Sequence, residues 1–353
     1  MAKLVCFDLE GPLSPQDNAY ELMGVLERGR EIFEVISLYD DLLTLKRRPG
    51  YEPGGTLALI APLLVLHALS EADIRRVSDD APLMEGAVEL IARLHAEGWA
   101  VHIISTSYSQ HAYNLGAKLG VPIENVACTR FTLDAYCEEF RGASGGLRPA
   151  IEEEILRLAE AAREPAMAAV LDKLLRVDLT PDEERAVAER LLRPLDELFR
   201  EKLAECGINR LLEEVEVVGG ARKARAAERF AQQRGLGLGD IVAVGDSITD
   251  GRMLEAVGCA GGVGIAFNAN RYALCSAAIG VASSSIANLW PILAAWDRAG
   301  WPGVREAIAE QAAGQIAQTD PYYSLLDEST STDVELVHAY YRKRARGEAA
   351  RLG

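Results

Sequence analysis

The chain has 353 residues, of which 49% are hydrophobic, and a formal net charge of −16. The length predicts about two domains with an ample core, and the composition excludes wholesale disorder and an integral membrane protein. The acidic balance argues against a nucleic-acid partner. The longest apolar stretch, residues 56–69, is too short to span a membrane. Six cysteines form no closely spaced pair, which favours buried thiols in a reducing, cytoplasmic compartment.

The first predicted element is a short buried strand that ends in two carboxylates. Residues 4–7 form an apolar run that is followed by Gly11 and Pro12, as is typical of a buried strand in a parallel sheet. Asp8 and Glu10 come at its end and point to the same side of an extended backbone. Ligands bind outside the carboxyl ends of such strands, so the pair is a candidate site. On this segment alone, a strand that merely ends in polar residues fits equally well.

Residues 14–83 show helical patterns, at residues 18–30, 31–45 and 70–77. Asp17 precedes the first of these helices and is a candidate helix cap. Arg47 lies within a basic triplet before a Pro-Gly pair. It either clamps a carboxylate or second phosphate of a substrate or belongs to an exposed charge run, and the second interpretation is favoured.

Hydroxyl groups and a lysine come next along the chain, at the end of a predicted strand and at the start of a predicted helix. The strand predicted at residues 99–104 ends in Ser105 and Thr106, which are hydroxyl donors. Lys223 follows two glycines and stands at the start of an amphipathic helix predicted for residues 224–233. Both segments therefore bring groups that bind anions to the ends of regular elements.

The segment between them, residues 140–213, is predicted to be helical. Thr180 to Glu183 forms a capping box with proline at the first helical position, and Pro194 kinks or restarts that helix. One apolar stripe runs along it, so the segment is expected to pack against another apolar surface. It is a candidate second cap, dimer arm or docking surface, and so a route to a homo-oligomer or a protein partner.

A second strand, residues 240–245, also ends in two carboxylates, Asp246 and Asp250. Two acidic strand ends that meet in one sheet repel each other. This repulsion raises the pKa of one of the carboxyl groups or recruits a cation. Mg²⁺ takes one or two carboxylates and leaves its other positions to water and phosphate. Together with the hydroxyl groups and Lys223, the two strand ends predict a phosphate site with a metal.

The C-terminal part, residues 297–353, is predicted to hold helices at 304–316 and 333–346, separated by a turn at Pro321 to Tyr323. A basic run from Arg342 to Arg346 ends the second helix. The favoured interpretation is that it complements the dipole of a solvated helix, and the alternative is an anionic partner.

Through these motifs the chain resembles the phosphoserine-phosphatase-like branch of the haloacid dehalogenase superfamily. Four motifs of that superfamily occur in the right order, at Asp8-Leu-Glu10, Ser105, Lys223 and Gly245-Asp246-Ser-Ile-Thr-Asp250. Four in sequence, each on its own predicted strand or helix start, are far more specific than any one. The stretch from Phe7 to Tyr20 also resembles archaeal proteins described as accessory subunits of an energy-converting hydrogenase.

The resemblance implies an α/β fold, a Rossmann-like doubly wound parallel sheet with a helical cap and a further helical insertion. The implied catalytic core covers residues 1–13, 84–139 and 214–296, the cap residues 14–83, the insertion residues 140–213 and the C-terminal extension residues 297–353. Closure of the cap over the site is expected. Asp17 lies where phosphoserine phosphatases carry an acid that reads the substrate's amino group.

The resemblance also implies a chemistry. Asp8 is the expected nucleophile and forms an aspartyl-phosphate, and Glu10 is the expected acid and base. Mg²⁺ is expected at Asp8, the carbonyl of Glu10, Asp246 and Asp250, with Ser105, Thr106 and Lys223 on the phosphate. In this position Glu10 replaces the commoner aspartate.

The expected function is therefore Mg²⁺-dependent hydrolysis of a small-molecule phosphomonoester, with an amino-acid phosphate such as phosphoserine favoured. The alternative is an accessory or interaction subunit that retains the fold without the chemistry. A phosphomutase, which keeps the same acid, fits less well.

Overall fold

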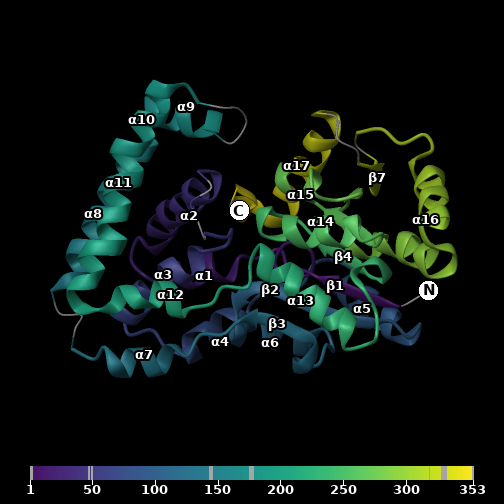
Figure 1. Cartoon of the computed structure of the whole chain (residues 1–353), viewed down its shortest axis with the longest axis horizontal. Helices are drawn as coiled ribbons and strands as arrows, with labels where there is room; N and C mark the ends of the chain where they lie inside the picture. Colours follow the sequence, from purple (N-terminus) through teal and green to yellow (C-terminus); the bar gives the residue numbers. More distant parts are fainter. Residues whose placement is uncertain are drawn as a thin grey trace. The chain divides into compact units, whose positions relative to one another are not determined.

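The computed structural model describes residues 3–46, 48, 51–142, 146–174, 179–317, 319–326 and 332–351. These residues belong to two compact units. Figure 1 colours the chain by sequence, from purple at the N-terminus to yellow at the C-terminus. One, the sheet unit, comprises Met1–Asn18, Arg75–Thr129 and Val217–Gly353. The other, the helical unit, comprises Ala19–Ile74 and Arg130–Glu216. The predicted cap and the predicted insertion both contribute to the helical unit, whereas the predicted C-terminal extension belongs to the sheet unit.

One seven-stranded sheet organises the sheet unit, with the strand order β3-β2-β1-β4-β5-β6-β7. The strands are β1 (Leu4–Phe7), β2 (Ala100–Tyr108), β3 (Val126–Thr129), β4 (Val242–Gly245), β5 (Val263–Phe267), β6 (Ile279–Ala282) and β7 (Tyr322–Leu325). All neighbours pair in parallel except β7, which is antiparallel to β6. The predicted α/β fold with a parallel sheet is confirmed.

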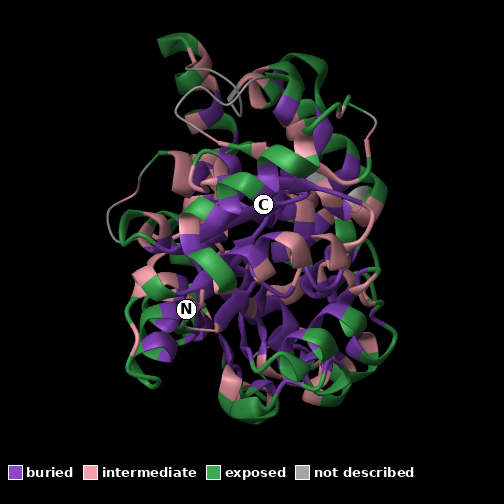
Figure 2. Cartoon of the chain, turned by 90° about the vertical axis from the view of Figure 1, so that its right-hand side faces the viewer, coloured by how far each residue is buried: buried purple, intermediate pink, exposed green. Residues whose placement is uncertain are grey.

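Both faces of the sheet are buried, which explains why its strands are almost continuously apolar. Successive side chains of β1 alternate between two cores. Val5 and Phe7 join one hydrophobic cluster, whereas Leu4 and Cys6 join the other. In Figure 2 the strands accordingly stand out as buried.

Helices and short helical turns link the strands of the sheet unit or follow its last strand. They are α5 (Ala87–Ala96), α6 (Ser109–Lys118), η1 (Ile123–Asn125), α13 (Ala221–Gln232), η6 (Leu238–Asp240), η7 (Ile248–Asp250), α14 (Gly251–Cys259), α15 (Arg271–Leu274), η8 (Ile286–Leu289), α16 (Trp290–Ala312), α17 (Thr332–Arg346) and η9 (Gly347–Arg351). Helix α16 comprises two helices joined at Gly300, whose φ of 59° breaks the regular path. Because that helix ends at Ala312, the expected helix at 304–316 is its second half, about one turn shorter.

The helical unit contains the remaining helices. They are α1 (Asn18–Met23), which begins at the last residue of the sheet unit's first segment, α2 (Gly29–Leu45), α3 (Thr56–Leu66), α7 (Leu133–Glu139), α8 (Leu147–Arg163), α9 (Pro165–Leu174), α10 (Pro181–Val187), η2 (Ala188–Leu192), α11 (Arg193–Glu197), η3 (Leu198–Lys202), η4 (Leu203–Cys206), η5 (Ile208–Arg210) and α12 (Leu211–Glu214). Helix α4 (Glu71–Asp79) contains the boundary between the units. The predicted capping box is present, since Thr180 accepts from Glu183 N–H and the Glu183 carboxylate accepts from Thr180 N–H. Pro194 lies in the first turn of α11, between two wide π-helical turns.

The structure corrects the prediction of a turn at Pro321 to Tyr323. Tyr322 and Tyr323 instead open β7, which pairs with β6 through Tyr322 opposite Ala282 and Tyr323 opposite Val281. The Tyr323 ring is buried, and its hydroxyl group donates to the carbonyl of Asn288 at 2.7 Å. A proline at the entry of an edge strand costs no ladder hydrogen bond, so Pro321 does not exclude the strand.

Among the described residues, no single helix is long and apolar enough to cross a membrane, although the bent pair α3 and α4 passes the test by length and composition. The residues of α3 from Leu57 to Leu66 are all buried, which is what a core helix requires.

The chain reverses its course across the sheet at β1, which pairs with β2 on one side and with β4 on the other. The order β3-β2-β1 followed by β4-β5-β6 is that of a doubly wound sheet, in which ligands bind where the order reverses. Asp8 N–H extends the pairing by donating to the carbonyl of Val244 at 2.8 Å. The two acidic strand ends of the sequence therefore lie at this switch point.

Candidate active site at the ends of β1 and β4

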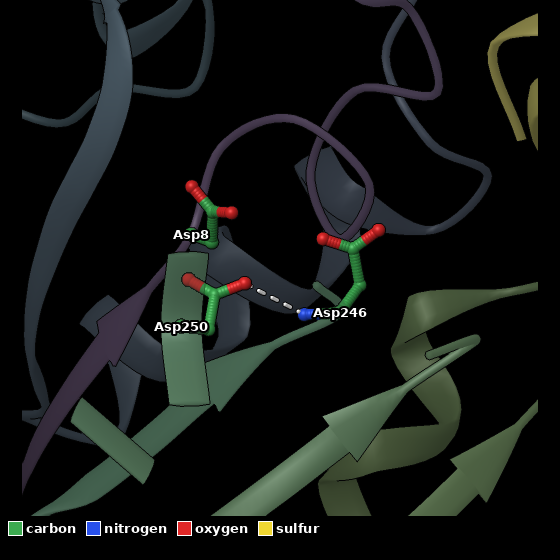
Figure 3. A group of neighbouring side chains, drawn as sticks. All are labelled: Asp8, Asp246 and Asp250. Atoms are coloured by element: carbon green, nitrogen blue, oxygen red, sulfur yellow. Dashed lines mark hydrogen bonds between the residues drawn. The ribbon is translucent and has the colours of Figure 1, made fainter. Parts of the chain in front are cut away.

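Three carboxylates gather where β1 and β4 end (Figure 3). Asp8, Asp246 and Asp250 are all buried, and one oxygen from each lies within 4.8 Å of the others. Asp8 follows β1 directly, Asp246 follows β4, and Asp250 ends the turn η7. The sequence prediction that the two acidic strand ends meet is confirmed.

Backbone hydrogen bonds and two glycines hold these carboxylates in place. Asp250 accepts from Asp246 N–H at 2.9 Å and from Ser247 N–H at 3.1 Å. Gly245 permits this close approach, because a Cβ atom there would lie 2.5 Å from Asp250 Cγ. Gly11 has a φ of +107°, and a Cβ atom there would lie 2.3 Å from Asp246 Cγ. Both glycines leave room for a carboxylate.

Lys223 neutralises part of this cluster. It lies in the first turn of α13, fully buried, with its Nζ atom 2.8 Å from Asp8 Oδ1 and 2.7 Å from Asp250 Oδ1. Burial lowers the pKa of Lys223, but Asp250 and Asp8 outweigh that effect and raise it above its ordinary value. The lysine therefore stays charged between two carboxylates that would otherwise repel each other.

Asp8 has the surroundings of a carboxylate that needs a cation. Its Oδ1 atom also accepts from Leu9 N–H at 2.7 Å. Burial, then Asp250 and Asp246, raise the pKa of Asp8 well above its ordinary value, against the opposing effect of Lys223. A further positive charge at this place would favour the ionised form.

Glu10 faces a separate group of polar side chains. Its carboxylate accepts from Asn18 N–H at 2.7 Å and from the hydroxyl group of Ser107. The Nε2 atom of the buried His111 lies 3.7 Å from Glu10 Oε1. Burial, followed by the charge of Asp17, raises the pKa of Glu10 to about 8. The raised pKa favours the protonated form of Glu10, which is the form that can donate a proton.

Ser105 and Thr106 lie in the C-terminal half of β2, next to Ser107. Ser105 is buried, and its hydroxyl group donates to Ser107 Oγ at 2.9 Å. Ser107 thus links Ser105 with Glu10. Thr106 accepts a hydrogen bond from Thr129 Oγ1 through its carbonyl, at 2.6 Å. That the two residues bind phosphate stays a prediction.

The tentative substrate residues are less well defined by the structure. Asp17 is partly buried at the edge of the same group, where its charge acts on Glu10 and on Arg346. Asp17 therefore lies near the site, although its contact with a substrate stays a prediction. Arg47 lies outside the described residues.

The structure adds two residues that the sequence interpretation misplaced, Arg342 and Arg346 of α17. Both guanidinium groups donate from Nη1 to Asp246 Oδ2, Arg346 at 2.8 Å. The side chains are only 4% and 6% exposed. The prediction of a solvated basic run at the end of a helix is therefore wrong for these two. Their spacing of four residues, which places them on one helix face, was the signal for a shared partner.

The cluster fits a divalent cation by its donor set. Three buried carboxylates within reach of one ion supply the hard oxygen atoms that Mg²⁺ prefers. In the described part of the chain, Asp246 Oδ1 is buried without a hydrogen-bond partner, as expected of an oxygen atom reserved for an ion. The cluster of Asp8, Asp246 and Asp250 could thus hold a metal ion.

Comparison with solved structures finds a counterpart for the entire chain. The gene product AF1437 from Archaeoglobus fulgidus is 27% identical, with a TM-score of 0.74 that covers 100% of this chain and 99% of that one. Both compact units therefore occur together in another protein.

More distant similarities are to phosphoserine phosphatases. The apo form of one is 17% identical with a TM-score of 0.44, covering 82% of this chain and 98% of that one. A probable phosphoserine phosphatase from Vibrio cholerae is 18% identical with a TM-score of 0.45, covering 88% and 67%. No protein-family model matches the chain, and no curated protein does.

Replacing Gly11 by alanine tests whether this glycine makes room for Asp246. We expect Gly11→Ala to lower the free energy of unfolding by more than the roughly 1–2 kcal/mol that left-handed backbone costs an alanine. The reason is that the new methyl group meets the Asp246 carboxylate. Gly120→Ala is the matched control, because Gly120 has a φ of +72° with nothing within 4 Å of its would-be Cβ atom. Urea denaturation measures both, and equal losses would contradict the assignment.

Lys223→Met tests whether the buried lysine holds the cluster together. Removing one partner of a buried ion pair leaves uncompensated charge, so we expect unfolding to become easier by about 3–5 kcal/mol. Lys343→Met removes an exposed lysine of α17 and should change stability by no more than about 0.5 kcal/mol. The interpretation fails if thermal and urea denaturation give the two variants the same stability.

Proposed function

We propose that the chain is a Mg²⁺-dependent phosphatase that hydrolyses a small-molecule phosphomonoester through an aspartyl-phosphate on Asp8. One observation carries the proposal: Asp8 directly follows β1 at the switch point of the sheet, beside a buried lysine and two further buried carboxylates. A nucleophile, a fixed cation and a set of metal ligands in one place are what phosphoryl transfer needs. The resemblance of the four sequence motifs to haloacid dehalogenase phosphohydrolases supports the same reaction.

Asp8 begins the reaction in this proposal. Its Oδ1 atom is held by Lys223 and by Leu9 N–H, so we assign the attack on phosphorus to Oδ2. The new bond joins Oδ2 to phosphorus, and the bond from phosphorus to the leaving oxygen breaks in line with it. Splitting the hydrolysis into two displacements lowers each barrier below that of the single step.

Glu10 donates a proton in the first step and accepts one in the second. With a pKa of about 8 it starts protonated and gives its proton to the leaving oxygen. The resulting carboxylate then takes a proton from the water that attacks the aspartyl-phosphate, which frees phosphate and restores both residues. The bonds from Asn18 N–H and Ser107 hold Glu10 in one orientation for both steps.

The transferred phosphoryl group is held by donors around Asp8. We assign this role to Lys223 and Ser105, with Thr106 beside them, because fixed donors aimed at developing charge stabilise the transition state. A Mg²⁺ ion held by Asp8, Asp246 and Asp250, with the carbonyl of Glu10, would supply positive charge to the phosphoryl oxygens.

The proposed substrate class rests on Asp17, at the edge of the polar group around Glu10. Asp17 supplies a carboxylate near Glu10, where the leaving group would lie. A carboxylate there favours a leaving group that carries an ammonium group, so we propose an amino-acid phosphate such as phosphoserine. The partner is then a small molecule, and the reaction itself requires neither nucleic acid nor membrane.

Activity on a panel of phosphomonoesters tests the proposed function. With Mg²⁺ we expect phosphate release from at least one small phosphoester, and Asp8→Asn should reduce the rate to background because asparagine is not a nucleophile here. Asp240→Asn is the matched control, since Asp240 is exposed just before β4 and outside the site. Released phosphate, measured with and without a chelator, gives the rates.

A panel on which wild type releases no phosphate, or on which Asp8→Asn releases it at the wild-type rate, would overturn the proposal. The alternative of an interaction subunit would then be favoured. In that case residues 140–213 would be the first surface to probe for a homo-oligomer or a protein partner.

A further inference from the structure

The C-terminal helix α17 reaches into the candidate active site with two buried cations. Arg342 and Arg346 both donate to Oδ2 of Asp246, one of the three carboxylates of the cluster. All three side chains are at least nine-tenths buried, so the contacts are shielded from water. Fully desolvated charges of this kind interact far more strongly than exposed pairs do.

The two arginines are anchored differently. Arg342 donates from Nε to the carbonyl of Ala350 at 2.9 Å and from Nη1 to the main-chain carbonyl of Asp246 at 3.1 Å. Arg346 binds Asp246 through Nη1, whereas its buried Nε atom has no hydrogen-bond partner among the described residues. Arg342 is therefore held by the main chain of η9 and of the residue after β4, and Arg346 is the easier of the two to displace.

The cluster already holds several cations of the chain. Lys223 contacts Asp8 and Asp250, and Arg342 and Arg346 contact Asp246. Asp17 and Glu10 also act on Arg346. A divalent cation bound by the same carboxylates would add two positive charges beside two guanidinium groups. Like charges this close disfavour each other, so guanidinium groups on Oδ2 of Asp246 weaken the binding of a cation at its unpartnered Oδ1 atom.

We propose that Arg342 and Arg346 are resident counter-cations of the site that set its affinity for a divalent cation, because their charges at Oδ2 of Asp246 oppose a cation on the same carboxylate. The inference rests on the metal site of the proposed function. It adds that α17, far along the chain from the four motifs, is part of that site. Metal binding then loosens the Arg346 contact, while Arg342 keeps Asp246 in orientation.

The opposite effect is a physical alternative, because residues that orient a metal ligand usually raise metal affinity. Loss of such an orienting partner typically weakens binding by about 10- to 100-fold. Removal of one buried like charge, in contrast, strengthens binding by roughly a hundredfold or more at an effective dielectric constant near 20. Since Arg342 still holds Asp246 when Arg346 is removed, we expect the charge effect to dominate.

Titration calorimetry of the metal-free full chain with MgCl₂ and with MnCl₂ tests the proposal without any assay of activity. We expect Arg346→Gln to bind both ions at least tenfold more tightly than wild type. Arg346→Lys, which keeps the charge, should bind within threefold of wild type. Lys343→Gln, which removes an exposed charge from the same helix, is the matched control and should also stay within threefold.

Hydrogen exchange provides the second readout, on the wild-type chain. Saturating Mg²⁺ should speed amide exchange in α17 and η9 if the cation displaces Arg346. Weaker or unchanged metal binding by Arg346→Gln overturns the proposal, as does slower exchange in α17 or the absence of metal binding by every variant. Tighter binding by Arg346→Gln without phosphatase activity in any variant would support the counter-cation role and count against the proposed function alone.

Discussion

The structure of the site depends on the buried contact of Lys223 with Asp8 and Asp250. Without that cation, strands β1 and β4 would bring ionised carboxylates together in a dry interior, and burial would force one of them to take up a proton. The lysine comes from α13, the carboxylates from β1 and η7, so one ion-paired group ties three elements to the switch point of the sheet. Glycines at 11 and 245 let the backbone come close enough for these contacts to form. Every chemical role proposed for the site presupposes this arrangement.

Much of this arrangement could be predicted from sequence, because it repeats a local pattern. An apolar strand that runs into acids is visible at residues 4–10 and again at 240–250, and the rule that parallel strands present ligand sites at their carboxyl ends brings the two together. Lys223 was found in the same way, as a cation after two glycines at a helix start. The roles of Ser105, Thr106 and Asp17 in binding stay predictions, since position alone does not show what a side chain binds.

The parts that sequence did not predict depend on long-range packing. The run from Arg342 to Arg346 has the composition of a solvated helix end, and only the fold reveals that two of its members point inward, 96 and 100 residues after Asp246. Strand β7 was missed for a similar reason: a proline and two tyrosines are typical of a turn until β6 supplies an edge for them to pair with. In both cases the partner lies far along the chain. The buried contacts of Arg342 and Arg346 with Asp246 follow from the same long-range packing.

The central claim, that this cluster transfers a phosphoryl group through Asp8, is tested most directly by trapping the intermediate. Wild-type protein would be mixed with Mg²⁺ and p-nitrophenyl phosphate, quenched in acid within one turnover and digested for peptide mass spectrometry. We expect one added phosphoryl group on the peptide that contains Asp8, and fragmentation that assigns it to that side chain. Release of nitrophenol with the phosphoryl group on any other residue, or with none on the protein at any quench time, would contradict it.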